Sequence, residues 1–360
     1  MGKLYVCKKL GINRVVFVYI AFLLFSIAAF RYEIGRDWEG YTSFFRNCLN
    51  SHSVSRFEPG FALLNKFFCM VSGNFYVMQF FIMTFCCVCV YGSFYRWSRY
   101  PVFTLFLYFV MYFLSTDMAQ TRQHIAIAIL LCGTRFVRER KLVLWIMVVI
   151  LAMQFHVTAL IAFPLYFTTG KDVSFRMAVF LYVICLITSF FGLYVIKWLL
   201  TFVISFRFVP ERIVRIGTFY LSSKLYGQKK EGVSFLVNYV FVFLMLFFYF
   251  TQQRERDRYF LMNFFIGFLF QAMGRNFDQF SRIANYYLIC GGGLCAYNLL
   301  IDCNKTFFKK IGVGKVFLCT IFLLAMLYHF YSNWTRVSFT GHSRKDDYTP
   351  YRCVLFEEIK

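Results

Sequence analysis

The chain has 360 residues, of which 60% are hydrophobic, 22% are aromatic and only 16% are charged. A soluble chain is typically about 45–50% apolar and about 25% charged, so this composition excludes an ordinary soluble fold. The net charge of +22 is compatible with nucleic-acid binding, but the basic residues lie in short loops between apolar runs. Membrane topology therefore explains the charge better, and we predict one all-α polytopic membrane domain over 1–360 without a nucleic-acid partner.

Apolar runs approaching the roughly 20 residues needed to cross a bilayer recur along the chain. They predict about eleven membrane-spanning helices, within a range of about ten to twelve. The predicted spans are 15–30, 75–94, 101–115, 117–137, 142–155, 157–169, 177–206, 233–250, 259–273, 283–301 and 316–332. The first run is followed by RYEIGRDWE and not by a small-residue cleavage site, so we interpret it as an anchor.

The distribution of Lys and Arg predicts the orientation of these spans. The N-terminal segment and every second loop are short and basic, which places them inside by the positive-inside rule. The N-terminus is therefore expected inside and the C-terminus outside. The long segments on the outer side are a first outer loop over 31–74, a basic loop over 207–232 and a tail over 333–360. In the first loop, FALLNKFFCMV is amphipathic and predicts a helix at the membrane interface or a plain surface helix.

The stretch 142–169 has two interpretations. Its halves have only about 14 residues each, which is short for a span at 1.5 Å per residue. One long helix would fit this length, but Lys141 and Lys171 both belong to predicted inner segments. Their placement favours a hairpin or re-entrant pair that turns at Gln154–His156, with a cavity near His156.

Arg122 is the clearest polar candidate inside a predicted span. A charge there costs about 2.5–3.5 kcal/mol on insertion scales, so it is a functional candidate by default. At 100° per residue it shares a face with Ala119, Ala126 and Ile129, and these neighbours would leave room for a ligand. The alternative is an arginine that extends to lipid headgroups. The basic loop 207–232 likewise suggests phosphate, or else anionic headgroups.

Carboxylates in the first outer loop are candidates for a general base acting on a sugar hydroxyl. Asp37 ranks first, Glu58 second and Glu39 third, with His156 in reserve. Asp37 and Glu39 could instead offset neighbouring arginines, and His156 could be a structural residue. Glu33 is expected to pair with Arg31, beside it at the membrane exit.

Thirteen Cys residues are scattered through the apolar runs, including the cluster Cys86, Cys87 and Cys89. We interpret them as reduced small hydrophobes, with a metal or redox site as the alternative. No metal and no cofactor is predicted. The chain lacks a Walker loop, a dinucleotide fingerprint, HExxH and GxSxG, which argues against ATP-driven transport.

Several segments, taken in order, carry a family resemblance. These are GRDWEGYTSFF, FEPGFALLNKF, TRQHIAIAILLCGTRFVRERK, FHVTALIAFPLYF, SRIANYY and the closing YTPYRCVLFE. Together they resemble the EpsG family of membrane polysaccharide polymerases, relatives of the Wzy O-antigen polymerases. The resemblance covers most of 31–169 and then separate points to the end. The family often has a second aromatic where Trp38 stands and Gln-Gly where Gln123-His124 stands.

The resemblance implies a Wzy-like or GT-C-like helical bundle with an outer-face cavity, in the bacterial inner membrane. It implies polymerisation, at the outer leaflet, of undecaprenyl-pyrophosphate-linked oligosaccharides for a capsule, exopolysaccharide or O-antigen. Other expected partners are membrane lipids and the flippase and chain-length regulator of the same pathway. The residues expected to bind pyrophosphate are Arg122, Arg282, Arg36, Gln123, Arg212 and Arg215. The residues expected to contact sugar or lipid are Trp38, Tyr41 and Tyr286.

Two other functions fit a chain of this class. A flippase for a lipid-linked sugar would also use internal arginines, but it needs no base and would carry charges along the middle of its spans. A membrane O-acyltransferase would need a His–carboxylate pair near the inner face, where the sequence shows none.

Overall fold

The computed structural model describes residues 11–49, 57–206, 208–209, 211–222, 255–274, 278–298 and 348–357, with isolated positions from 239 to 331. Throughout this described part the regular structure is helical, and one isolated β-bridge joins Arg31 to Cys353. The predicted all-α class is therefore confirmed. The chain forms two compact units, Met1–Thr169 with Asn304–Lys360, and Gly170–Cys303.

The first unit contains most of the described helices. They are α1 (Gly11–Ala29), α2 (Trp38–Asn47), α3 (Pro59–Val71), α4 (Phe75–Trp97), α5 (Pro101–Tyr108), a π-helical segment (Phe109–Phe113), α6 (Leu114–Thr116), α7 (Thr121–Arg138), α8 (Leu142–Met153), a 3₁₀ segment (Val157–Ala162) and α9 (Leu165–Thr168). Local sequence explains several starts. Asn74 caps α4 by accepting a hydrogen bond from the Tyr76 amide at 2.8 Å, and Pro59 begins α3, where a missing N–H costs nothing.

Among the described residues, one helix is long and apolar enough to cross a membrane, namely α4. Shorter apolar helices of 10–17 residues coincide with other predicted spans, for example Asn13–Ala29, Leu142–Met153 and Tyr259–Gly274. The predicted spans 233–250 and 316–332 lie outside the described residues, apart from isolated positions. The count of eleven spans therefore stays a prediction.

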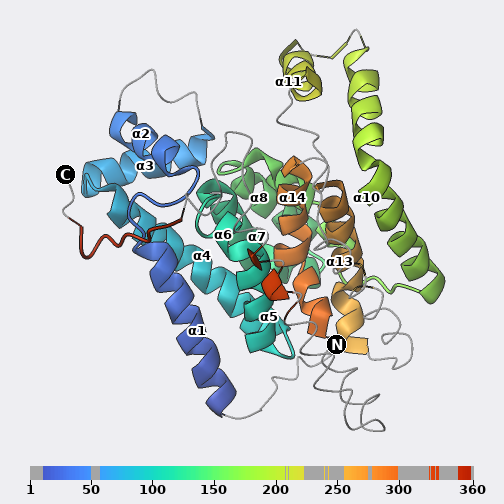
Figure 1. Ribbon diagram of the computed structural model, residues 1–360, viewed down its shortest axis with the longest axis horizontal. Helices are drawn as coiled ribbons and strands as arrows, with labels where there is room; N and C mark the ends of the chain where they lie inside the picture. The colour runs from blue at the N-terminus through green and yellow to red at the C-terminus, as the bar shows by residue number, and fades with distance from the viewer. Residues whose placement is uncertain are drawn as a thin grey trace. The chain divides into compact units, whose positions relative to one another are not determined.

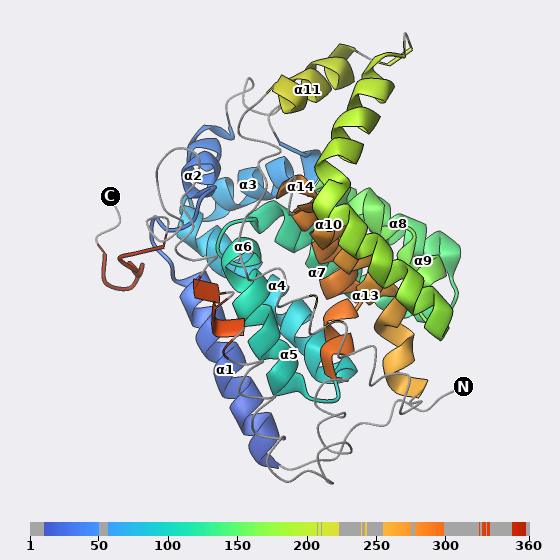
Figure 2. The same ribbon diagram turned by 45° about the vertical axis from the view of Figure 1, so that its right-hand side comes forward.

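The helices of the first unit run back and forth between two ends. Rings of Phe17 and Tyr95 are 5.2 Å apart, as are those of Tyr32 and Tyr76, so α1 and α4 are antiparallel. We call the end that carries residues 30–37 the loop end, and the opposite end the basic end. The loop end also carries the starts of α4 and α7, and Figures 1 and 2 both show α2 and α3 there. The basic end carries Arg14, Arg96, Arg99, Arg135, Arg138, Arg140 and Lys141.

The stretch 142–169 is a hairpin and not one long helix. The indole nitrogen of the fully buried Trp145 donates to the Phe163 carbonyl at 3.1 Å. Arg140 and Tyr166 exchange hydrogen bonds of 2.6 and 2.8 Å, which returns the second half to the basic end. The helix breaks at Gln154–His156, as one of the two interpretations predicted.

The second unit contains α10 (Phe175–Ile204), α11 (Glu211–Ser222), α13 (Glu255–Gly274), α14 (Asp278–Asn285), a π-helical segment (Tyr286–Cys290) and a 3₁₀ segment (Gly293–Tyr297). The structure of this unit differs from the sequence prediction at two places. The basic loop 207–232 contains α11, and the predicted span 283–301 is broken at Gly291–Gly293, where Gly292 has a φ of +69°. The side chain of Asn263 in α13 donates to the Gly291 carbonyl at 2.9 Å and so provides a hydrogen bond to a backbone group at the break.

Gly35 allows the first outer loop to pack closely on the turn before α7. Its φ is +112°, which side-chain-bearing residues rarely adopt, and a Cβ there would overlap the Met118 carbonyl oxygen. We expect Gly35→Ala to destabilise the protein by about 2–4 kcal/mol, the sum of backbone strain and forced repacking. Gly92→Ala is the control, because Gly92 is exposed on α4 and its Cβ would meet nothing within 4 Å, so it should stabilise by about 0.5–1 kcal/mol. Thermal unfolding of the detergent-purified variants measures both, and equal midpoints would contradict the expectation.

Candidate active site

An ion pair between Glu58 and Arg122 joins two of the residues singled out from the sequence. One guanidinium nitrogen of Arg122 lies 2.5 Å from a Glu58 carboxylate oxygen. Both side chains are largely but not fully enclosed, with exposed fractions of 24% for Arg122 and 17% for Glu58. The pair connects the start of α3 to the start of α7 at the loop end. Because a planar guanidinium on a carboxylate is a strong, directional contact, it fixes where Arg122 points.

Aromatic rings enclose the guanidinium of Arg122. Its central carbon lies 4.4 Å from the centre of the Phe57 ring. The buried Tyr41 ring packs on both Phe57 and Phe61, with centroids 5.9 and 5.5 Å apart. A cation over an aromatic face is stabilised further when water is excluded, so this setting holds Arg122 in place. The Arg122 Nε–H is buried and makes no hydrogen bond to any residue described.

The Asp37 carboxylate belongs to the same electrostatic environment. Burial raises the pKa of the Tyr41 phenol, the Asp37 charge raises it further, and the Arg122 guanidinium opposes the rise. Tyr41 therefore stays protonated at neutral pH and can donate a hydrogen bond. Asp37 itself is half-buried at the start of α2 and makes no side-chain capping hydrogen bond there. Within the described residues its carboxylate has no hydrogen-bond or ion-pair partner.

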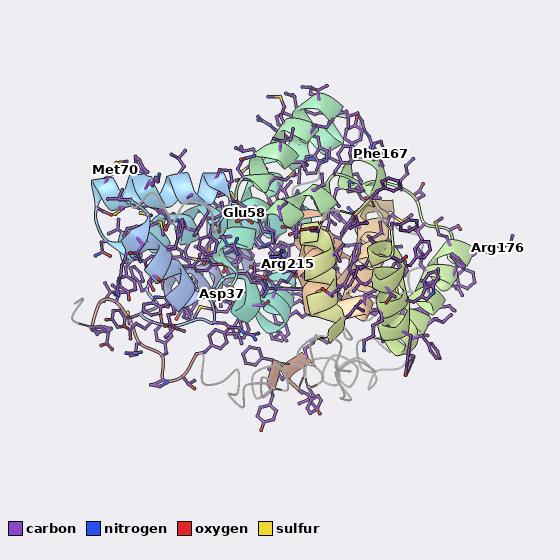
Figure 3. All side chains as sticks on the ribbon, turned by 90° about the horizontal axis from the view of Figure 1, so that it is seen from above. Asp37, Glu58, Met70, Phe167, Arg176 and Arg215 are labelled. Atoms are coloured by element: carbon purple, nitrogen blue, oxygen red, sulfur yellow. The ribbon has the colours of Figure 1, made fainter. Side chains whose placement is uncertain are left out.

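The hairpin turn at Gln154–His156 also reaches this site. The second Glu58 oxygen accepts a hydrogen bond of 3.4 Å from the Val157 amide, next to His156. The Gln154 carbonyl accepts a hydrogen bond of 2.8 Å from the Gly60 amide, so α3 begins against the turn. The His156 Nδ1 lies 2.5 Å from the Thr158 hydroxyl. The structure thus brings together Asp37, Tyr41, Glu58 and Arg122, with His156 at the edge; Figure 3 shows Glu58 and Met70 at opposite ends of α3.

Other predicted residues lie in different settings. Arg36 and Glu39 are exposed near Asp37, and Trp38 is half-buried with an indole nitrogen that bonds to no described residue. Gln123 is buried in the interior of the first unit. The rest belong to the second unit: Arg212 and the exposed Arg215 on α11, the half-buried Arg282 on α14, and the fully buried Tyr286.

The pairing expected between Glu33 and Arg31 is wrong. Glu33 pairs with Arg352 at 2.9 Å, whereas Arg31 is buried and donates to the Ala28 carbonyl at 2.5 Å and to the Thr121 hydroxyl at 3.5 Å. The φ of Glu33 is +52°, so the chain turns at this residue and its side chain leaves the direction of Arg31. Proximity in sequence therefore did not bring these charges together.

A buried polar cluster surrounds Asp117 and was not predicted from the sequence. This fully buried carboxylate accepts hydrogen bonds from Tyr108 at 2.5 Å, Tyr91 at 3.2 Å and the Cys87 thiol at 3.7 Å. His124 Nε2 lies 3.9 Å from it. Cys87 is free and buried, and its thiol adds a weak donor to this cluster. The sequence signal was an aspartate in a span, but its partners come from three separate helical segments.

Comparison with known proteins gives one match. The model of the EpsG family covers residues 14–352, nearly the whole chain. No curated protein and no solved structure matches the chain significantly. The family consists of Wzy-type polysaccharide polymerases, which are membrane proteins of surface polysaccharide biosynthesis. Because its model spans almost every residue described above, the chain belongs to the EpsG family.

Proposed function

We propose that this protein polymerises oligosaccharide repeat units carried on undecaprenyl pyrophosphate, at the outer leaflet of the bacterial inner membrane. The observation that carries the proposal is the arrangement of Arg122, Tyr41 and Asp37 at the loop end. It combines a held cation, a protonated phenol and a carboxylate to which no described residue bonds. Glycosyl transfer from a lipid pyrophosphate needs a cation for the leaving group and a base for the acceptor.

Asp37 acts as the base in this proposal. It accepts the proton of the acceptor sugar hydroxyl, while that oxygen attacks the anomeric carbon of the growing glycan. The bond between the anomeric carbon and the pyrophosphate oxygen breaks, and its electron pair leaves with the pyrophosphate. The half-buried position of Asp37 suits this role, because the acceptor and the departing proton both need access from water.

Arg122 stabilises the charge that develops on the leaving pyrophosphate. Its Nε–H has no partner among the described residues, and we expect it to bind an oxygen of the leaving pyrophosphate. Arg36, next to Asp37, supplies a second cation. Arg212, Arg215 and Arg282 remain proposed pyrophosphate ligands of the second unit, and Tyr286 a proposed contact.

Glu58 is better suited to positioning than to catalysis. Both of its oxygens are engaged, one by Arg122 and one by the Val157 amide. It thereby connects α3, α7 and the hairpin turn. Trp38 and Tyr41 offer ring faces and polar edges for sugar contacts. Glu39 and His156 remain secondary candidates for the base.

The charge distribution of the first unit supports the proposed orientation. The basic end carries seven Lys and Arg residues between Arg14 and Lys141 with Glu139 as their acidic neighbour, as expected of a cytoplasmic face. The loop end mixes both signs. α3 lies at this end and exposes Leu63, Phe67 and Met70 along one side, as expected of a helix at the outer interface.

The direct test is a polymerisation assay with purified protein and lipid-linked repeat units. A ladder of glycan lengths that grows with time supports the proposal. A flippase would instead move single units across proteoliposome membranes without producing a ladder. An O-acyltransferase would change the mass of a unit without lengthening it. Either of these results, with no ladder under any condition, would overturn the proposal.

A further inference from the structure

Within the C-terminal segment predicted as a tail over 333–360, the structure describes residues 348–357, and from here on "the tail" means these residues. Their backbones pair with the first outer loop. The Tyr32 amide donates to the Arg352 carbonyl and the Val354 amide donates to the Phe30 carbonyl, both at 2.9 Å. These two bonds flank the antiparallel bridge between Arg31 and Cys353. The tail therefore adds a short paired segment to the point where α1 ends.

Side chains of the tail extend this contact to the end of α1 and to the segment that precedes α7. Arg352 pairs with Glu33 at 2.9 Å and lies 5.6 Å from the centre of the Tyr32 ring. Tyr351 donates to the Ile27 carbonyl at 2.9 Å. Tyr348 is buried and donates to the Leu114 carbonyl at 2.9 Å, in the short helix that precedes the Asp117 turn.

The segments held by the tail are those that carry Asp37 and Arg122. Residues 30–33 lead through Gly35, which packs on the Met118 carbonyl, to Asp37. Leu114 leads through the same turn to Arg122. Glu33 has a φ of +52°, an unfavourable conformation for a residue with a side chain, and its ion pair with Arg352 lies at this turn. The tail is the one described segment that bonds to both 30–33 and 114.

We propose that the tail is a positioning element for the polymerisation reaction, and that it fixes the distance between the Asp37 carboxylate and the Arg122 guanidinium. This inference rests on the proposed function of those two residues. A misplacement of about 1 Å at reacting groups can cost about 10²-fold in rate. The tail is therefore expected to control kcat, while binding of the lipid-linked substrate changes little.

The first experiment removes residues 348–360 from the full-length protein, with removal of 358–360 as the matched control. We expect the longer truncation to lower kcat about 10²-fold with little change in KM, and the control to match wild type. Adding a synthetic peptide of residues 346–357 should restore part of the rate. If the longer truncation folds and polymerises at the wild-type kcat, the proposal is overturned.

Point variants test the role of the tail if the truncated protein fails to fold. Tyr348→Phe removes one buried hydrogen bond and should lower kcat about two- to tenfold, while Tyr351→Phe removes an exposed one and should have little effect. Arg352→Glu should lower kcat about two- to fivefold through repulsion from Glu33, and adding Glu33→Arg should recover it. Wild-type kcat in both Tyr348→Phe and Arg352→Glu would overturn the proposal.

Hydrogen exchange separates this proposal from the proposed function. The Tyr32 amide should exchange faster in Arg352→Glu than in wild type, because repulsion from Glu33 loosens the tail whose residue 352 carbonyl accepts from this amide. If wild type forms no ladder, the proposed function fails whatever the exchange result. If wild type forms a ladder and neither exchange nor kcat responds to the tail, only the tail proposal fails.

Discussion

Arg122→Ala should abolish measurable chain extension, lowering kcat by at least about 10²–10³-fold. This is the range found when one preorganised donor to a developing negative charge is removed. The guanidinium is held by Glu58 at 2.5 Å and by the Phe57 ring at 4.4 Å, so it is already oriented before substrate arrives. The measurement is the rate of ladder formation with saturating lipid-linked repeat unit. Arg122→Lys should retain part of the rate, because an ammonium keeps the charge but lacks the planar fork.

Removing Arg122 alone also leaves Glu58 partly buried without its counter-ion, which by itself destabilises the protein. The double variant Arg122→Ala with Glu58→Gln controls for this effect. The side-chain carbonyl introduced by Glu58→Gln can still accept from the Val157 amide, so thermal stability should recover while activity does not. Activity that returns together with stability would show that Arg122 is structural. Full-length polymer from the Arg122→Ala single variant would exclude a role in catalysis.

Asp37→Asn should lower the rate of polymerisation by about 10²–10⁴-fold, the usual contribution of a general base. The substitution keeps the size of the side chain and removes only its ability to accept a proton. No described residue bonds to this carboxylate, so stability should change by less than about 0.5 kcal/mol. Binding of the lipid-linked unit, measured separately, should also stay near wild type.

Glu39→Gln is the matched control for Asp37→Asn, because Glu39 lies two residues away on the same helix and its side chain is not buried. With Asp37 as the base, we expect Glu39→Gln to polymerise at the wild-type rate, whereas a loss in Glu39→Gln beside a wild-type rate in Asp37→Asn would make Glu39 the base. Equal losses in both variants would indicate a general effect of negative charge at the start of α2. A wild-type rate in Asp37→Asn would show that Asp37 is not the base, and His156→Ala would then be the next variant to assay.

Sequence patterns predicted the helices of this chain better than their contacts. Hydropathy alone located α1, α4, α7, α10 and α13 to within a few residues. It could not decide between one helix and a hairpin at 142–169, because both halves are apolar throughout. The hairpin depends on the Trp145 indole reaching the Phe163 carbonyl and on Arg140 reaching Tyr166. Such contacts become visible only when the chain is folded.

The candidate site shows the same limit. Glu58, Arg122, Asp37 and Tyr41 were each identified from the sequence, yet the pairing of Glu58 with Arg122 was not, because 64 residues separate them. The break in the predicted span 283–301 had a sequence signal in its three consecutive glycines, Gly291–Gly293, which favour positive φ. The Asp117 cluster had a weaker sequence signal, because the tyrosines that donate to Asp117 belong to two other helices, α4 and α5.

The bridge between Arg31 and Cys353 constrains how often the chain crosses the bilayer. α1 has 19 residues and rises about 28 Å from Gly11, close to the thickness of a hydrocarbon core. With α1 spanning the membrane, Arg31 and the tail bound to it lie on the face opposite to Gly11. Two ends of a chain on opposite faces require an odd number of crossings, whatever path the chain follows between them. The predicted count of eleven spans is odd and so meets this requirement, whereas ten or twelve would not.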